Sequence, residues 1–305
     1  MVSLFHAYSF THPITQEKSF FYPTNGMQLT KLEKIKATFF GIRPIKKVKT
    51  IDPSYVTLDF EAIEFYSRDN IIIRGWLIKG DPIKPTVIVA HGYLTDKASL
   101  LSIIQMLHKQ GFTVLAFDFR GVGSSNGTYI SFGFYEKNDV LSAVDFLKKR
   151  EDIVSDEIYG YGVSMGAAAL VFAEEEESHF DGLILDSCYT DLYQNVGTRF
   201  KEVYGFPKFP FATALTFFGG LVLGTNGFTI SPMESISNIN IPILIIQSEN
   251  DNSVLLEEGR ALFLSANEPK YFWIVDNAKH ANAYNEYPQK YESAVFSFFN
   301  DIANK

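Results

Sequence analysis

Two hydrophobic periods alternate along most of the chain. Short apolar runs rich in branched and aromatic residues, which predict strands, are followed by longer segments with apolar residues at helical spacing. The predicted strands are 62–66, 71–78, 86–90, 112–117, 157–161, 182–185, 241–246 and 271–275. The predicted helices in this part of the chain are 100–109, 138–149, 167–176, 255–264 and 289–299.

The connections between these elements predict an α/β fold. Arg68-Asp69-Asn70 joins the first two strands over a short distance, which is typical of a hairpin. The later strands alternate with helices, so they should be parallel, with right-handed crossovers and helices on both faces of the sheet. In such sheets ligands bind at the carboxyl ends of the strands, and we expect the functional residues there.

The segment before the first strand has a different pattern. Residues 29–40 carry apolar side chains at helical spacing, with lysines elsewhere around the turn. Such a helix suits docking on an anionic membrane surface, or packing on the main domain with its lysines in water. We expect packing, and therefore divide the chain into an N-terminal extension, 1–55, and a main domain, 56–305.

Composition narrows the possible partners and location. The net charge of −8 and the pI near 5.3 argue against nucleic acid, because phosphate binding needs a basic surface. No uninterrupted apolar stretch has the length of a membrane span, and the N-terminus lacks the layout of a signal peptide. The single cysteine, Cys188, forms no internal disulfide, which fits a reducing compartment. We expect a cytoplasmic protein with a buried, inert thiol at Cys188.

The most specific motif lies between the strand 157–161 and the helix 167–176. Gly162-Val163-Ser164-Met165-Gly166 fits G-x-S-x-G, in which the glycines allow a sharp turn that raises the serine hydroxyl above the sheet. Because a serine hydroxyl needs a base to become a nucleophile, a histidine must lie nearby. His91 and His280 directly follow strands, and His280, in the loop after the last strand, is the predicted base.

A carboxylate is needed to orient the imidazole and stabilise its charged form. Asp251 lies between the penultimate strand and its helix, and Asp186 follows the strand after the nucleophile's helix. We favour Asp251 and keep Asp186 as the alternative. The backbone N–H groups of Met165 and Tyr93 are the predicted oxyanion donors, because they follow the serine and the strand-ending His91-Gly92 pair.

The long connection 195–238 predicts a helical lid over the catalytic groove, because it leaves and re-enters the sheet beside Ser164. It is unusually aromatic for a surface segment, so its rings should either attach the lid to the domain or line an acyl pocket. The predicted substrate-binding residues come from this segment and from the loop after 86–90. They are Gly92, Leu94, Phe206, Phe217 and Phe218.

Taken together, the motifs resemble those of the α/β-hydrolase superfamily. Those that carry the resemblance are His91-Gly92 after a strand, Asp118 to Gly127 (D-x-R-G-x-G-x-S-x-G), Gly162 to Gly166, Asp251 and His280. The Asp118 stretch and the ending that runs from His280 to Tyr291 are most similar to a bacterial group of esterase-like and prolyl-oligopeptidase-related hydrolases. Two positions depart from the pattern: Gln247-Ser248 replaces a common His-Gly in the acid loop, and Lys279 replaces a common glycine before the base.

The resemblance implies a mostly parallel eight-stranded sheet, acyl-enzyme chemistry, and neither a metal nor an organic cofactor. The expected activity is hydrolysis of carboxylic esters with short to medium acyl groups, on a small-molecule substrate. Thioesters and peptide-like amides are alternatives with the same mechanism. A non-catalytic binding protein on the same fold is a further alternative, because a fold alone does not determine function.

Overall fold

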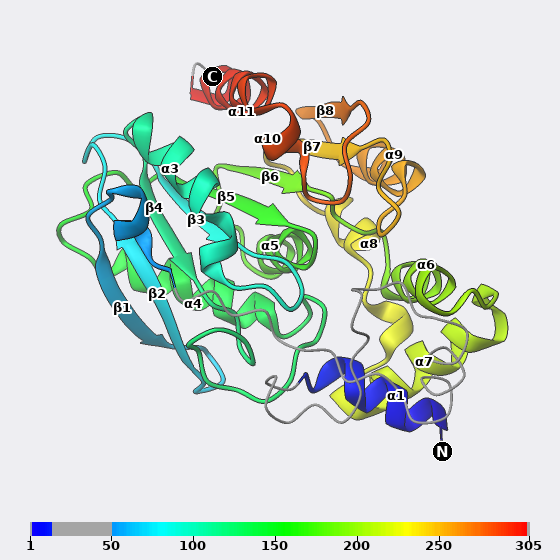
Figure 1. Ribbon diagram of the computed structural model, residues 1–305. Helices are drawn as coiled ribbons and strands as arrows, with labels where there is room; N and C mark the ends of the chain where they lie inside the picture. Colours follow the sequence, from blue (N-terminus) through cyan, green and yellow to red (C-terminus); the bar gives the residue numbers. More distant parts are fainter. Residues whose placement is uncertain (1, 14–50, 304–305) are drawn as a thin grey trace.

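The computed structural model describes residues 2–13 and 51–303, and the predicted helix at 29–40 lies outside them. Within the described residues the chain forms one eight-stranded sheet in the order β1-β2-β4-β3-β5-β6-β7-β8 (Figure 1). The strands are β1 (Glu61–Tyr66), β2 (Ile72–Ile78), β3 (Thr86–Ala90), β4 (Thr113–Phe117), β5 (Ile158–Val163), β6 (Gly182–Asp186), β7 (Ile243–Ser248) and β8 (Lys270–Val275).

The sheet is mostly parallel, as predicted. β2 pairs antiparallel with both β1 and β4, and every other pairing is parallel. The hairpin between β1 and β2 turns through Asn70, which has a positive φ of 64°. The central strands β3, β4, β5 and β6 are buried along their whole length, which explains their continuous apolar sequences.

Helices cover both faces of the sheet and bury two apolar cores. The helices of one core are α4 (Glu136–Lys148), α5 (Met165–Glu176), α8 (Pro232–Ile236) and α9 (Leu256–Ser265). The helices of the other core are α3 (Leu101–Lys109), α10 (Ala283–Glu286) and α11 (Pro288–Ala303). The 3-10 turns η2 (Pro53–Val56) and η3 (Lys97–Leu100) pack on the second core, and the 3-10 turn η4 (Gly227–Thr229) contacts the insertion described next.

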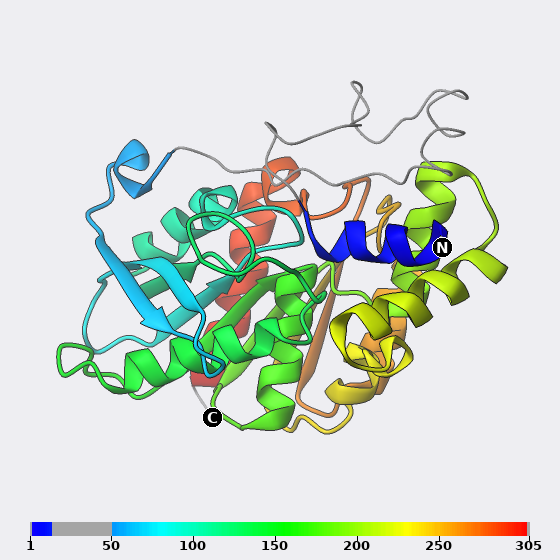
Figure 2. The same cartoon turned by 90° about the horizontal axis from the view of Figure 1, so that it is seen from below.

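A smaller helical group lies beside the carboxyl ends of the strands. It contains α6 (Leu192–Tyr204) and α7 (Lys208–Leu223), which fall in the predicted insertion, and α1 (Val2–Thr11) from the start of the chain. Figure 2 shows α1 lying along α7, away from the sheet. The cap of α6 explains its start, because the Asp191 carboxylate accepts a hydrogen bond from the N–H of Gln194.

Candidate active site

Ser164 lies at a sharp turn between β5 and α5. Its φ of 54° and ψ of −114° are unusual for a residue with a side chain, and the strain is held by close packing around two glycines. A Cβ on Gly162 would lie 2.6 Å from the Ala167 backbone, and one on Gly166 would overlap the carbonyl oxygen of Ala90. The turn therefore requires glycine at both positions, which is why the G-x-S-x-G spacing is informative.

Three side chains from three loops meet at this turn. The Ser164 Oγ lies 3.1 Å from Nε2 of His280, and Nδ1 of His280 lies 2.7 Å from Oδ2 of Asp251. Because a carboxylate only accepts hydrogen bonds, Nδ1–H donates to Asp251, and Nε2 accepts the hydrogen bond from the serine hydroxyl. Ser164 and Asp251 are nearly buried, whereas His280 is partly exposed. This geometry suits removal of the serine proton by His280.

The Asp251 carboxylate is held by its own loop. Its Oδ1 accepts backbone hydrogen bonds from Ser253 at 2.8 Å and Val254 at 2.9 Å, and its Oδ2 accepts a 3.4 Å bond from the amide of Gln247. Gln247 is one of the positions that depart from the family pattern, and it is fully buried. The unusual glutamine therefore orients the acid instead of displacing it.

Asp186, the alternative acid, does not contact His280. Its carboxylate accepts hydrogen bonds from the hydroxyls of Ser187 and Tyr291, both at 2.8 Å, and burial raises its pKa. The Ser187 hydroxyl in turn accepts the N–H of Ala281, the residue after His280, at 3.2 Å. Through Ser187, Asp186 is therefore linked by hydrogen bonds to the loop that carries His280.

His91 and the loop after β3 complete the turn's surroundings. The His91 ring is fully buried; its Nε2 accepts the N–H of Phe119, its Nδ1–H donates to the Gly92 carbonyl, and burial lowers its pKa. His91 is therefore a neutral structural residue. Gly92 lies against Ser164, because a Cβ built on it would be 3.6 Å from the Ser164 Cβ. Met165 is the first residue of α5, and the first N–H groups of a helix have no partner within it.

The motif at Asp118 to Gly127 is structural. The Asp118 carboxylate accepts hydrogen bonds from the side chain of Lys97 at 2.5 Å and from the N–H of Ser124 at 2.7 Å. The fully buried Arg120 pairs with Asp139 of α4 at 2.7 Å and with Asp69 of the hairpin turn at 2.5 Å. These ion pairs hold the loop between β4 and α4 in place.

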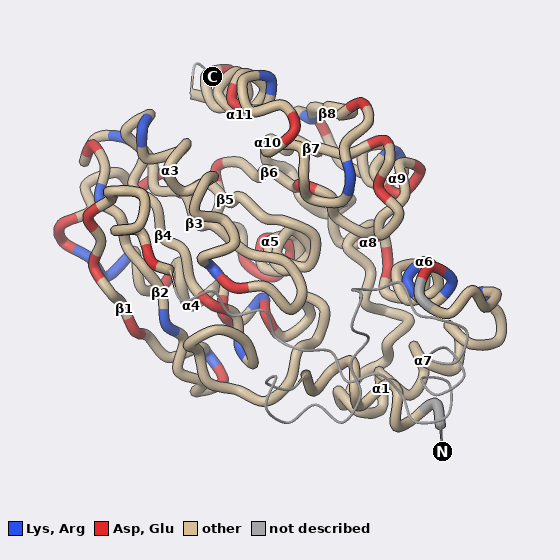
Figure 3. The backbone as a smooth tube through the Cα atoms, viewed as in Figure 1, with Lys and Arg blue, Asp and Glu red and all other residues tan. Residues whose placement is uncertain are grey.

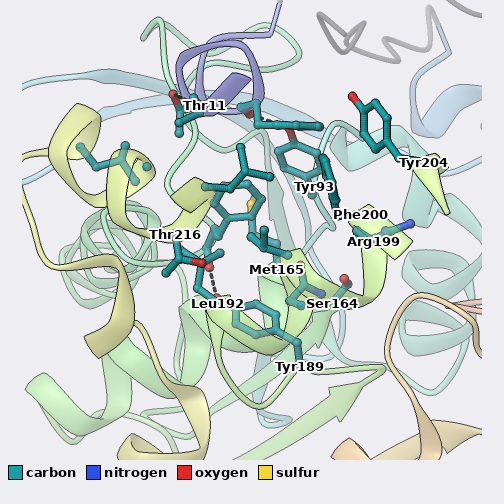
Figure 4. Close-up of a pocket in the computed structure, with 18 residues that line it drawn as sticks. Thr11, Tyr93, Ser164, Met165, Tyr189, Leu192, Arg199, Phe200, Tyr204 and Thr216 are labelled. Atoms are coloured by element: carbon teal, nitrogen blue, oxygen red, sulfur yellow. Dashed lines mark hydrogen bonds between the residues drawn. The ribbon is translucent and has the colours of Figure 1, made fainter. Parts of the chain in front are cut away.

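A largely apolar cavity of about 120 Å³ opens beside Ser164 (Figure 4). Its floor includes Ser164 and Met165, Thr11 of α1 lies on the opposite side, and the Tyr93 ring lies toward α1. The remaining residues that line it come from α1, α6, α7 and nearby loops. They are Ala7, Phe10, Phe132, Tyr189, Leu192, Asn195, Val196, Arg199, Phe200, Tyr204, Leu215, Thr216, Gly219 and Leu223.

The five predicted substrate-binding residues are not among those that line this cavity, so their role in substrate binding stays a prediction. Phe206 packs with the Phe200 and Tyr204 rings, and Phe217 and Phe218 lie on other sides of α7 from its lining residues. Phe217 is 52% exposed. Gly92 and Leu94 lie in the loop after β3 and are not part of the cavity lining. Since α7 is apolar on nearly all sides, its sequence does not reveal which side faces the cavity.

Sequence reasoning also missed the contribution of α1. Ala7, Phe10 and Thr11 recur at helical spacing and form one wall of the cavity. The end of α1 is fastened to the main domain: the Tyr93 hydroxyl donates to the Phe10 carbonyl at 2.6 Å, and the N–H of Ile130 donates to the Thr11 carbonyl at 2.7 Å. A short helix without charged residues carries no sequence signal for such a role.

Among residues 2–13 and 51–303, no group of three or more His, Cys, Asp or Glu side chains is placed to hold a metal ion. In the same residues no single helix is both long and apolar enough to cross a membrane. The segments 208–223 and 227–236 together have the length and apolar composition of a membrane span, but they are bent by 101° where they join.

The fold is that of the α/β hydrolases, and the comparisons with known proteins support hydrolase activity. More specifically, residues 81–215 match the family model described as serine aminopeptidase, S33. The structure of the Pyrococcus furiosus esterase PF2001 is similar, with a TM-score of 0.73 and 26% identity; the match covers 85% of this chain and 97% of the esterase.

Similar sequences come from bacteria and from mammals. The uncharacterized protein YqkD of Bacillus subtilis (strain 168) is 29% identical over 254 residues, which cover 80% of this chain and 83% of YqkD. Lysophosphatidylserine lipase ABHD12 of Rattus norvegicus is 27% identical over 187 residues, which cover 59% of this chain and 44% of the lipase.

Proposed function

We propose that the protein is a serine hydrolase that cleaves carboxylic esters through an acyl-enzyme intermediate. The observation that carries the proposal is the contact of Ser164 with His280, itself held by Asp251, at the floor of a mostly apolar cavity. An apolar acyl chain fits such a cavity, and each buried methylene contributes about 0.8 kcal/mol.

In the proposed reaction Ser164 Oγ attacks the acyl carbon while His280 Nε2 takes the serine proton. The backbone N–H groups of Met165 and Tyr93 stabilise the negative oxygen of the tetrahedral intermediate. His280 then gives the proton to the departing alcohol, which leaves an acyl group on Ser164. Water attacks this ester with His280 as base, and the carboxylic acid and free serine are released. Asp251 holds the imidazole orientation and stabilises its charged form throughout.

The cavity favours esters over the aminopeptidase substrates that the matched family description names. An aminopeptidase must recognise a charged α-amino group, which calls for an acidic side chain in the site. The cavity lining contains no Asp or Glu among the residues that the structure describes, and its charged side chain is Arg199. The similar solved structure, by its title, is an esterase. Thioesters share the proposed chemistry and are the second candidate.

A panel of p-nitrophenyl esters from acetyl to decanoyl tests the proposal, together with labelling by a fluorophosphonate probe. We expect the probe to label Ser164, and Ser164→Ala to abolish labelling and to lower ester turnover by a factor on the order of 10⁴. Thermal unfolding of the variant serves as the control for folding. Undiminished labelling or turnover in the folded Ser164→Ala variant would contradict the proposed nucleophile.

A further inference from the structure

The helices that cover the cavity have two apolar faces. The inner face of α1 lines the cavity, while its Phe5 and Tyr8 point to other sides and are each more than two-fifths exposed. The same holds for α7, where Leu215 and Gly219 face the cavity and Phe217 and Leu221 are more than half exposed. We name these two packed helices the roof of the site.

Most of the large exposed hydrophobic residues in the described part of the chain belong to this roof or to the segments next to it. Those on the roof or beside it are Leu4, Phe5, Tyr8, Phe209, Phe217, Leu221 and Phe228. Figure 3 shows the same contrast in charge: the tube is almost entirely tan along α1 and α7, whereas red and blue are scattered over the rest of the molecule. From Phe209 to Met233 there is no charged residue at all. Contiguous exposed apolar surface of this kind marks a docking site.

The charges that border the roof are mainly positive. The segment from Leu192 to Leu223 holds three cations, Arg199, Lys201 and Lys208, and one acid, Glu202, although the whole chain carries a net charge of −8. Arg199 lines the cavity, and its guanidinium lies 3.9 Å from the Glu202 carboxylate. The Lys208 ammonium lies over the Tyr193 ring and forms no ion pair with a described carboxylate. An apolar face with cations at its border suits an interface with anionic headgroups.

We propose that the roof docks on the surface of an anionic lipid membrane and that ester substrates enter the cavity from that surface. The inference rests on the proposed function for its second half, because the lipid ester must be hydrolysed at Ser164. A lipid surface fits better than a protein partner because the exposed apolar face of the roof has cations at its border, and the same two helices line the apolar cavity with their other face. An amphiphilic ester then moves from bilayer to cavity without exposing its acyl chain to water.

Binding is tested with the full-length chain by co-sedimentation with vesicles. The vesicles are phosphatidylcholine alone, or phosphatidylcholine mixed with phosphatidylglycerol. The test variant is Phe5→Ser with Leu221→Ser, one residue from each helix of the roof, and the matched control is Leu264→Ser with Ile83→Ser. The control residues are as apolar and even more exposed, at 77% and 78%, but lie in α9 and in the loop before β3.

We expect the intact chain and the control to bind the anionic vesicles, with weaker binding to phosphatidylcholine alone. The roof variant should partition into the vesicles roughly tenfold less, because two half-exposed side chains no longer enter the interface. Equal binding by all three proteins, or no binding by the intact chain, would overturn the proposal. Sedimentation velocity without lipid identifies a competing occupant: a dimer that the roof variant loses would assign the roof to a second copy of the chain and also overturn it.

Activity on two substrates separates this proposal from the proposed function. Hydrolysis of soluble p-nitrophenyl butyrate should be unchanged in the roof variant, since its inner face and Ser164 are intact. Hydrolysis of a monoacylglycerol embedded in anionic vesicles should fall in parallel with vesicle binding. If neither ester is hydrolysed by the intact chain, the proposed esterase function fails while the binding result still decides docking. If the vesicle ester is hydrolysed equally well by the roof variant, entry from the surface is wrong.

Discussion

At the scale of single residues, Asp251 and Asp186 are two buried acids with different neighbours. Asp251 contacts His280, and Asp186 contacts Ser187 and Tyr291. Asp251→Asn should therefore lower ester turnover at neutral pH by a factor on the order of 10⁴, because the imidazole loses its partner and adopts the wrong tautomer. Asp186→Asn should cost less than tenfold. Initial rates on p-nitrophenyl butyrate measure both, and the opposite ranking in folded variants would move the acid to Asp186.

Cys188 lies close in sequence to the cavity-lining Tyr189 but does not line the cavity itself. It is fully buried, its thiol lies near the Tyr189 carbonyl, and burial raises its pKa. Because the thiolate is the reactive form, the native protein should resist Ellman's reagent for as long as it stays folded. Unfolding in urea should release one reactive thiol per chain. Rapid labelling of the native protein, with parallel loss of activity, would instead place this thiol at the site.

At the scale of elements, α1 provides a wall of the cavity through Ala7, Phe10 and Thr11. Ala7→Phe should fill part of the cavity, so that the preferred acyl group becomes shorter by a few carbons while turnover of the acetyl ester stays within about threefold of the original. Phe5→Trp is the matched control, because it enlarges a side chain on the exposed side of the same helix. The measurement is the ratio of kcat/KM for the hexanoyl ester to that for the acetyl ester. Equal ratios in both variants would contradict the inference that α1 forms a wall of the acyl-binding cavity.

The secondary structure of the main domain was largely predictable, and the cavity was not. The strands begin and end within two residues of their predicted bounds, because runs such as Thr86–Ala90 are apolar throughout and end at His91-Gly92. The contact of Ser164 with His280 was predictable, because the proposed chemistry requires both residues directly after strands. The acid was only favoured, since two carboxylates follow strands and only the three-dimensional contacts separate them. The walls could not be found, because α1 and α7 are apolar all around and give no period to orient them.

At the scale of the whole molecule, Arg120 joins three distant parts of the chain: its own loop, Asp69 in the hairpin turn and Asp139 in α4. Arg120→Met should lower the free energy of unfolding by about 3 kcal/mol, because it leaves Asp139 buried without its partner. Urea unfolding at pH 8 measures this loss. Lys84→Met, at an exposed lysine near the same sheet, is the control and should change stability by less than about 0.5 kcal/mol.

The loss should also depend on pH. Burial raises the pKa of Asp139 to about 7 despite the opposing effect of Arg120, so removal of the guanidinium raises it further. An acid with a raised pKa in the folded state binds an extra proton there, and stability then increases as the pH falls toward the unfolded-state pKa. The difference between Arg120→Met and the original protein should therefore be smaller at pH 6 than at pH 8. A difference that grows at pH 6 would show that Asp139 is not the group left uncompensated.

The fastening of Phe10 and Thr11 to the main domain also has a consequence for biosynthesis. These residues leave the ribosome before the strands, whereas α6 and α7, which also line the cavity, emerge only after six of the eight described strands. At usual translation rates the delay is on the order of ten to forty seconds. During this interval α1 has no partner for its apolar residues, so the nascent chain exposes a segment suited to chaperones. The cavity wall that α1 provides is therefore completed late, after α6 and α7 have been synthesised.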